Sequence, residues 1–275
     1  MKSLRATIIS NKKTGDDFRL MRLESAYLAK TARPGQFVEV RCSAGSGAAT
    51  DPLLRRPFGV HRIVKGGIEI LYKTVGRGTG ILSRKEPGDE VEVLGPLGNG
   101  FDIKKAQRAI IVAGGIGAAP LVALAQKLGK ADVFIGARSR SHIMCEKEFK
   151  ALGCTVRVAT EDGSKGYKGL ITVLLEDALR NIGDARRTII YPAPEAQDDR
   201  TFRRNVQIYA CGPTGMLKAV AALARSHGVN CQVSLEERMA CGVGVCLGCP
   251  VKVRGGDYKM VCKDGPVFDA EEIVW

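Results

Sequence analysis

Four cysteines near the end of the chain constrain its fold more than any other feature. They follow the spacing C-x4-C-x2-C-x12-C and are Cys241, Cys246, Cys249 and Cys262. This is the thiolate spacing of a plant-type [2Fe-2S] cluster. The glycines between them, Gly242, Gly244 and Gly248, have no Cβ, so the backbone amides can come close to anionic sulfur. The sequence therefore predicts a bound one-electron carrier.

A structural zinc site with four thiolate ligands is the alternative. Such ligands more often arrive as two matched C-x2-C pairs in tetrahedral geometry. Here the run is asymmetric and rich in glycine, which favours the iron–sulfur interpretation. A zinc-stabilised binding module without enzymatic activity stays open as the non-enzymatic alternative.

The other cysteines indicate a reducing compartment. The chain has nine cysteines, an odd number, and residues Met1 to Phe18 show no charged segment followed by an apolar one. Reduced thiols then fit better than disulfides, so Cys42, Cys145, Cys154 and Cys231 need only be small buried apolar residues. The longest uncharged run, Ala109 to Ala125, is short and broken by glycines and Pro120, so we expect no membrane span. A soluble cytoplasmic protein is the expectation.

The formal net charge of +13 suggests an anionic partner. Four ligating thiolates and a dinucleotide pyrophosphate would offset several of these charges. The remaining excess is spread along the chain and forms no dense basic run with interleaved aromatic residues, so we do not expect nucleic-acid binding. A solvated basic surface is the simplest explanation, and an acidic protein partner the next.

The first hundred residues have the pattern of an antiparallel β-barrel. Short apolar runs alternate with turn residues such as Pro34-Gly35, Gly66-Gly67 and Pro87-Gly88. The expected strands are Ala6–Ile9, Phe18–Leu23, Gln36–Val40, Gly59–Val64, Ile68–Thr74 and Glu90–Val93.

After Phe101 strands and helices alternate, which is typical of a doubly wound, mostly parallel sheet. Strands are expected at Ala109–Ala113, Asp132–Gly136, Thr155–Ala159, Val206–Ala210 and Gln232–Leu235, and helices at Ala118–Leu128, Glu146–Leu152, Leu170–Leu179 and Thr214–Ser226. The segment Asp184–Asn205, rich in Arg and Asp, is expected to be a surface excursion.

Two glycine-containing turns follow strands of this second region. Gly114-Gly115-Ile116-Gly117 lies between a buried strand and a helix, where small residues let the backbone approach a pyrophosphate. Cys211-Gly212-Pro213 follows the strand at 206–210, at the edge of the sheet where ligands bind. Either turn alone could be an ordinary strand-to-helix connection.

The barrel region carries two further candidate segments. Arg55-Arg56-Pro57-Phe58-Gly59 places two guanidinium groups beside an aromatic ring, which suits a phosphate next to a planar ring system. Gly76-Arg77-Gly78-Thr79-Gly80 offers backbone amides and a hydroxyl to an anion. Because both precede a nucleotide-type domain, we expect a flavin.

In the order barrel, nucleotide domain and cysteine cluster, the chain resembles the ferredoxin reductase superfamily. It is most similar there to the electron transfer subunits of class 1B dihydroorotate dehydrogenases, enzymes of pyrimidine biosynthesis. The segments that carry the resemblance are Arg55–Phe58, Val75–Thr79, Gly95–Phe101, Gly114–Pro120, Cys211–Pro213, Ser234–Cys241 and Val261–Phe268.

The resemblance implies three domains: an FAD-binding β-barrel at 1–101, an NAD-binding α/β domain at 102–235 and a [2Fe-2S] domain at 236–275. The implied FAD contacts are Arg56, Pro57, Phe58, Gly59, Tyr72, Gly78 and Thr79, with Arg56 on the pyrophosphate. The implied NAD(H) contacts are Gly115, Gly117, Cys211, Gly212 and Pro213. Relatives usually carry serine where Gly59 stands, so a hydroxyl contact to the flavin is lost here.

The resemblance also implies a partner. Electrons from dihydroorotate, oxidised in a separate FMN-containing catalytic subunit, would pass through the cluster and FAD to NAD+ in an assembly of two copies of each subunit. A ferredoxin:NADP oxidoreductase or sulfide dehydrogenase subunit with FAD and [2Fe-2S] is the alternative. The histidines His61, His142 and His227 are scattered and no catalytic triad is expected.

Overall fold

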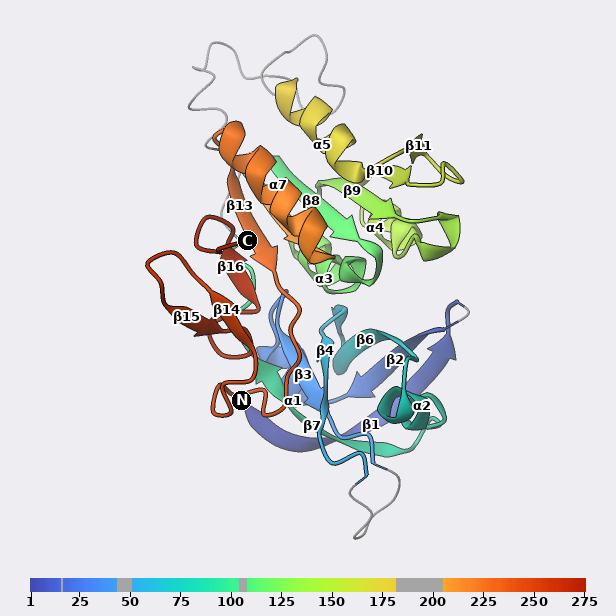
Figure 1. Ribbon diagram of the computed structural model, residues 1–275. Coiled ribbons are helices and arrows are strands. Elements are labelled where there is room, and N and C mark those ends of the chain that lie inside the picture. The colour runs from blue at the N-terminus through green and yellow to red at the C-terminus, as the bar shows by residue number, and fades with distance from the viewer. Residues whose placement is uncertain (16, 44–50, 104–107, 182–204) are drawn as a thin grey trace. The chain divides into compact units, whose positions relative to one another are not determined.

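The computed structural model describes residues 1–15, 17–43, 51–103, 108–181 and 205–275 of the chain (Figure 1). Contacts divide them into two compact units. The first is Met1–Phe101, Val122–Leu124 and Leu235–Val267, and the second is Asp102–Leu121, Ala125–Ser234 and Phe268–Trp275. The predicted excursion at Asp184–Asn205 lies outside the described residues apart from Asn205. The division into three domains stays a prediction.

The first unit contains a seven-stranded antiparallel sheet in the order β4-β3-β7-β1-β2-β6-β5. Its strands are β1 (Lys2–Lys13), β2 (Phe18–Glu24), β3 (Phe37–Val40), β4 (Arg56–Gly59), β5 (Arg62–Val64), β6 (Gly67–Lys73) and β7 (Glu90–Leu97). The outermost strands, β4 and β5, are consecutive in the chain, so the sheet curls on itself. The rings of Phe58 on β4 and Tyr72 on β6 meet edge to face with centroids 5.5 Å apart. The predicted barrel is confirmed.

The barrel core follows the two-residue period of its strands. On β3, Val38 and Val40 are fully buried in a core that includes Leu23 and Ile70. Glu39 between them faces the other side of the sheet, where it is also buried. Burial on both faces of β3 therefore points to a second layer over this part of the barrel.

The structure corrects the strand expected at Gly59–Val64, because Gly59 ends β4 and Arg62 begins β5. It also adds two helices, α1 (Ala26–Thr31) and α2 (Arg77–Ser83). Ser25 caps α1 by accepting the Leu28 N–H at 3.3 Å. Helices of six or seven residues are too short to show a helical period, which explains why the pattern did not predict them.

The second unit contains a seven-stranded sheet in the order β11-β10-β9-β8-β12-β13-β16. Its strands are β8 (Arg108–Gly114), β9 (Asp132–Ala137), β10 (Thr155–Thr160), β11 (Tyr167–Lys168), β12 (Val206–Cys211), β13 (Asn230–Ser234) and β16 (Val267–Asp269). The pairings from β11 to β13 are all parallel. Strand order reverses between β8 and β12, which makes the carboxyl ends of these two strands the expected ligand site.

The helices of the second unit are α3 (Ala118–Leu128), α4 (Glu146–Ala151), α5 (Ile171–Arg180) and α7 (Thr214–Ser226), with the short 3-10 turns η1 (Gly115–Gly117) and η2 (Arg140–His142). The predicted doubly wound sheet is confirmed, and the expected helix bounds are correct for α3 and α7 and within one residue for α4 and α5. None of the helices in the described ranges has the length and apolar character needed to span a membrane.

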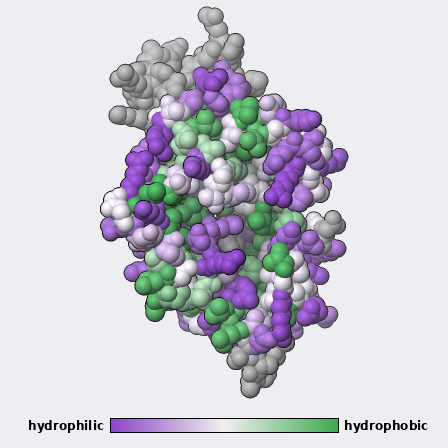
Figure 2. Space-filling model, in the orientation of Figure 1, coloured by the Kyte–Doolittle hydropathy of each residue, from purple (hydrophilic) through white to green (hydrophobic). Residues whose placement is uncertain are grey.

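The C-terminal segment adds a small hairpin to the first unit, with β14 (Pro250–Lys252) paired antiparallel to β15 (Tyr258–Met260). The chain then continues into β16, the edge strand of the other sheet. Hydrophilic and hydrophobic side chains are intermixed on the face drawn in Figure 2.

Candidate functional site

The four predicted cluster cysteines lie together in the first unit. Sulfur atoms accept backbone N–H groups across the loop: Val243 donates to Cys241 Sγ at 3.4 Å, Gly244 to Cys262 Sγ at 3.1 Å, Cys246 to Cys241 Sγ at 3.5 Å and Cys262 to Cys249 Sγ at 3.4 Å. The structure therefore brings together all four thiols that the spacing selected.

These N–H groups stabilise negative charge on the sulfur atoms that accept them. Burial by itself raises the pKa of a thiol, but the backbone N–H groups of Cys246 and Val243 outweigh it and lower the pKa of Cys241 to about 6. Burial, and then the neighbouring Cys249, raise the pKa of Cys262. Backbone N–H groups that donate to the sulfur atoms of four neighbouring cysteines suit the binding of an anionic iron–sulfur cluster.

The loop conformation depends on residues with positive φ. Gly242 has φ +69° and Gly244 has φ +82°, and Leu247 adopts φ +56°. The backbone at Gly242 also packs tightly, because a Cβ there would lie 2.8 Å from Glu39 Cγ and 3.0 Å from Glu39 Oε1. On Gly244 a Cβ would lie 2.7 Å from the Lys263 side chain. Glycine is therefore needed at both positions.

Glu39 is a site residue that the sequence analysis missed. Its exposed fraction is 1%, and neither carboxylate oxygen has a hydrogen-bond partner among the described residues. Burial raises the pKa of Glu39 to about 7, the Arg55 guanidinium opposes this rise, and the Cys241 thiol adds to it. A single glutamate in a strand pattern gave no signal, because such a residue usually faces water.

The first predicted flavin segment lies beside Glu39. Pro57 on β4 is the register partner of Glu39 on β3, and opposite residues of an antiparallel pair share a face. The cluster loop, Glu39 and the predicted flavin segment are therefore neighbours within the first unit.

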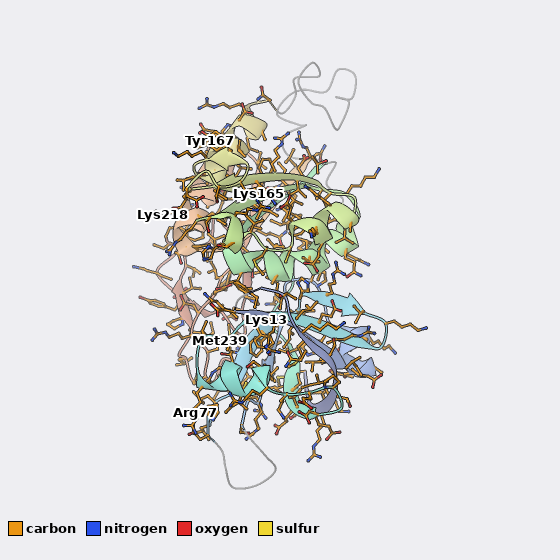
Figure 3. The ribbon with its side chains drawn as sticks, turned by 90° about the vertical axis from the view of Figure 1, so that its right-hand side faces the viewer. Lys13, Arg77, Lys165, Tyr167, Lys218 and Met239 are labelled. Carbon is orange, nitrogen blue, oxygen red and sulfur yellow. The ribbon has the colours of Figure 1, made fainter. Side chains whose placement is uncertain are left out.

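The second predicted flavin segment forms the start of α2. A Cβ at Gly78 would lie 3.2 Å from Arg56 Nε, so the Arg56 side chain crosses this glycine. The Thr79 hydroxyl accepts the N–H groups of Val75 and Gly76 at 3.0 and 3.2 Å and caps the helix. Arg77, labelled in Figure 3, pairs with Asp51 at 2.5 Å. The structure thus brings Arg56 and Gly78 together, as a pyrophosphate site requires. The Thr79 hydroxyl instead accepts hydrogen bonds from the N-terminal end of its own helix.

The remaining predicted flavin contacts differ in exposure. Phe58 and Tyr72 are 9% and 2% exposed and lie ring to ring, and the Tyr72 hydroxyl donates to Asn11 Oδ1 at 3.0 Å. Pro57 and Gly59 are half-buried. Pro57 and Gly59 are thus the more accessible of the four, and flavin contact by each of them stays a prediction.

The two predicted nucleotide turns pack backbone to backbone in the second unit. A Cβ at Gly117 would lie 2.6 Å from the Cys211 carbonyl oxygen, and one at Gly212 would lie 2.9 Å from Gly114 Cα. Gly115 has φ +54° and open space around it. Pro213 is the N-cap residue of α7. The turns therefore form one glycine-lined surface at the carboxyl ends of β8 and β12, which fits a pyrophosphate.

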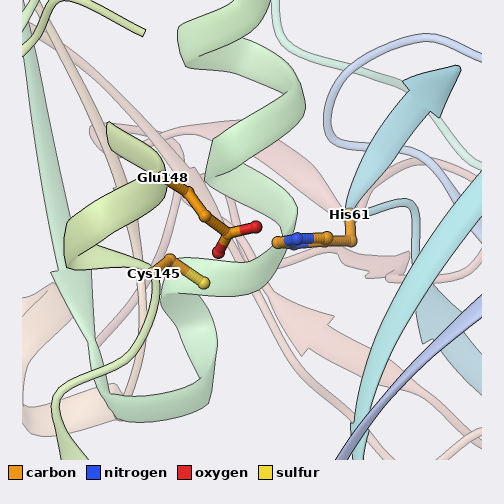
Figure 4. A group of neighbouring side chains, drawn as sticks. All are labelled: His61, Cys145 and Glu148. Carbon is orange, nitrogen blue, oxygen red and sulfur yellow. The ribbon is translucent and has the colours of Figure 1, made fainter. Parts of the chain in front are cut away.

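A pair of possible metal ligands lies elsewhere, in the second unit. Cys145 and Glu148, at the start of α4, place a sulfur and a carboxylate oxygen within 4.8 Å of each other (Figure 4). Cys145 is half-buried, so it is more exposed than the sequence predicted, and it has φ +60°. His61, the third side chain in Figure 4, belongs to the other unit, and we make no assignment for the three together.

Two protein families match parts of the chain. The family "Iron-sulfur cluster binding domain of dihydroorotate dehydrogenase B" matches residues 236–274, and "Oxidoreductase NAD-binding domain" matches residues 111–222. These ranges contain the four cluster cysteines and both nucleotide turns, respectively.

Relatives matched over nearly the whole of both chains agree with these matches. The chain is 37% identical to the "Dihydroorotate dehydrogenase B (NAD(+)), electron transfer subunit" of Caldanaerobacter subterraneus subsp. tengcongensis, covering 99% of this chain and 98% of the relative. It is 39% identical to the protein of that name from Bacillus caldolyticus, over 98% of both chains.

Among solved structures, the chain is similar to one described in "Insights into flavin-based electron bifurcation via the NADH-dependent reduced ferredoxin-NADP oxidoreductase structure". The TM-score is 0.77 with 33% identity, over 98% of this chain and 90% of the other. The cytochrome b5 reductase domain of Ulva prolifera nitrate reductase shares the fold, with a TM-score of 0.61 and 17% identity over 87% and 96% of the two chains.

Proposed function

Because the chain belongs to the family of electron transfer subunits of dihydroorotate dehydrogenase B, we propose that it carries electrons from a separate dihydroorotate-oxidising subunit to NAD+. It is an oxidoreductase subunit that uses FAD, a [2Fe-2S] cluster and NAD(H). The observation that carries the proposal is the convergence of four thiols on a loop packed beside the predicted flavin segment.

The cofactors supply the redox chemistry: bound FAD exchanges a hydride with nicotinamide and single electrons with the cluster, which neither NAD nor the cluster can do alone. Dihydroorotate loses two electrons and two protons to become orotate, while NAD+ gains two electrons and one proton. The two electrons and one of the two protons would therefore end in NADH, and the remaining proton would go to solvent.

We assign the chain's own residues to holding these groups in place. Cys241, Cys246, Cys249 and Cys262 hold the cluster. Arg56, with the backbone at Gly78, holds the FAD pyrophosphate, and the Pro57–Gly59 segment lies against the flavin ring. Gly115 gives the NAD pyrophosphate access to the backbone, while Gly117 and Gly212 keep the two turns together.

The partner in this proposal is an FMN-containing catalytic subunit, with two copies of each subunit in the assembly. It would dock over the outer side of the cluster loop, where Val245 is 80% and Leu247 is 66% exposed beside the exposed ligand Cys246. Apolar side chains next to a cluster ligand suit a dry contact across which an electron can pass. The nine free cysteines favour the cytoplasm.

The test is reconstitution. The purified chain should contain iron, sulfide and FAD, and NADH should bleach both flavin and cluster absorption. Adding the FMN-containing subunit and dihydroorotate should reduce NAD+, and neither subunit alone should do so. A colourless protein with stoichiometric zinc, or a coloured one that NADH leaves oxidised, would contradict the proposal.

The second candidate is the FAD and [2Fe-2S] subunit of a ferredoxin:NADP oxidoreductase or sulfide dehydrogenase. The 33% identity to the ferredoxin-NADP oxidoreductase structure favours it. Co-purification from the native source separates the two candidates. An FMN-containing partner supports the first, and a larger flavoprotein with [4Fe-4S] clusters supports the second.

A further inference from the structure

A buried carboxylate without a hydrogen bond requires an explanation, because burying such a group is costly. Glu39 is 1% exposed, and both of its oxygens lack hydrogen-bond partners among the described residues. It lies on β3, which pairs with the edge strand β4 on one side and with β7 on the other. An apolar residue at this position would stabilise the barrel at least as well. The buried carboxylate therefore indicates a function.

The covering layer over Glu39 is the cluster loop. A Cβ at Gly242 would lie 3.0 Å from Glu39 Oε1 and 3.2 Å from the side chain of Leu97, so the carboxylate lies directly under the backbone of this loop. The residue before Gly242 is the ligand Cys241. No residue separates the Glu39 carboxylate from the backbone that holds the first cluster ligand.

Nearby arginines do not neutralise Glu39 by direct pairing. Arg55 Nη2 donates to Glu92, and Arg41 Nε lies 3.0 Å from the same carboxylate. Glu92 therefore pairs with both arginines, of which Arg41 directly follows β3 and Arg55 directly precedes β4. Arg56 acts on Glu39 only through its electrostatic field, and Lys263 packs against Gly244, further along the loop. Glu39 thus has no hydrogen-bonded cation among the described residues, and Arg55 and Arg56 offset its charge only in part, from a distance.

We propose that Glu39 lowers the reduction potential of the iron–sulfur cluster. Its carboxylate lies under the cluster loop, where a negative charge disfavours the addition of an electron to the cluster. A negative charge in a poorly screened interior destabilises the more negative, reduced cluster. Electrons then leave the cluster more readily for the flavin, whose predicted segment includes the register partner Pro57. This inference rests on the proposed function, since it requires the cluster.

The test is an EPR-monitored redox titration of the complete chain at pH 8.5, with dithionite as the one-electron reductant. Glu39→Gln keeps the size of the side chain and removes its charge. The reduction potential of the cluster should become more positive. At a fixed applied potential, the ratio of reduced to oxidised cluster should rise roughly three- to tenfold, and a tenfold rise corresponds to a shift of about 59 mV. The EPR line shape should stay that of the wild type.

Two further variants complete the test. Glu90→Gln removes a carboxylate that is exposed on β7 and paired with Arg5, and it should leave the potential unchanged. Glu39→Met replaces Glu39→Gln in the titration if Glu39→Gln does not bind a cluster. It should shift the reduction potential of the cluster in the same direction. The inference is overturned if a loaded Glu39→Gln keeps the wild-type potential, or if both variants lose the cluster, because Glu39 would then be structural. A wild-type chain without a cluster would overturn the proposed function instead.

Discussion

The carbonyl oxygen of Cys211 lies so close to Gly117 that a Cβ at position 117 would be 2.6 Å from it. Gly117→Ala must therefore push apart the turns after β8 and β12. We expect roughly tenfold weaker NADH binding, from a strain of about 1–3 kcal/mol. The rate of flavin bleaching as a function of NADH concentration measures this. Gly215→Ala is the matched control, since a Cβ there meets nothing within 4 Å; equal effects from both variants would contradict the assignment.

The nucleotide turns could be predicted from the sequence because their signals are local. Glycine and proline directly after an apolar strand indicate a strand-to-helix turn, and alternating elements place such turns at one edge of a sheet. The observed packing of Gly117 on Cys211 follows from that placement. The bounds of α3 were predictable for the same reason, since its apolar run ends at Gly129.

Glu39 and β16 could not be predicted, because both depend on distant parts of the chain. Glu39 is buried by Gly242, about two hundred residues later in the sequence, and its own neighbours predict only a strand. The three-residue strand β16 becomes an edge of the second sheet although it follows the cluster segment. Local propensity contains no information about either pairing.

The cluster assignment predicts a selective effect of removing one thiol. Cys262→Ser should lower bound iron to less than roughly a fifth of the wild-type content, because a hydroxyl is a poor ligand for this cluster. FAD should stay bound, since its predicted contacts lie on the barrel. Iron and flavin analysis of the purified variant measures both. Cys154→Ser alters a buried thiol in the other unit and should keep its iron; loss of iron there as well would argue against a specific site.

Gly242 tests the close packing under the cluster loop. Gly242→Ala combines a positive φ of +69° with a Cβ 2.8 Å from Glu39 Cγ. We expect a loss of stability of about 2–4 kcal/mol and faster release of the cluster. Gly256→Ala has a positive φ of +95° but open space, so it should cost only about 1 kcal/mol. The decay of visible absorption on heating compares the two, and equal decay would mean that backbone strain alone matters.

The flavin assignment depends on Arg56. Arg56→Gln removes the guanidinium that crosses Gly78, and we expect FAD to bind roughly ten- to a hundredfold more weakly. Fluorescence titration of the flavin-free protein with FAD measures the change. Arg5→Gln removes an exposed guanidinium on β1 and should bind FAD as the wild type does. Unchanged FAD affinity in Arg56→Gln would mean that another group holds the pyrophosphate.

Glu146 gives the chain a pH-dependent contribution to stability. Burial raises the pKa of this carboxyl, but Lys150 and Lys165 outweigh it and hold the pKa below the ordinary value of 4.5. The folded state therefore binds this proton less readily than the unfolded state. The stabilisation is fully present above pH 4.5 and is lost as the pH falls through the lowered pKa.

Glu146→Gln should accordingly lower the free energy of unfolding by roughly 1 kcal/mol at pH 7, which corresponds to a fall in Tm of about 2–4 °C. The difference in Tm between the two proteins should shrink only below pH 4.5. Circular dichroism melting curves of both proteins across this range measure it. Glu176→Gln breaks an exposed pair with Arg180 four residues away on α5 and should change Tm by less than about 1 °C. A difference that shrinks as the pH rises would contradict this assignment, because a lowered carboxyl pKa can lose its stabilising effect only on the acid side.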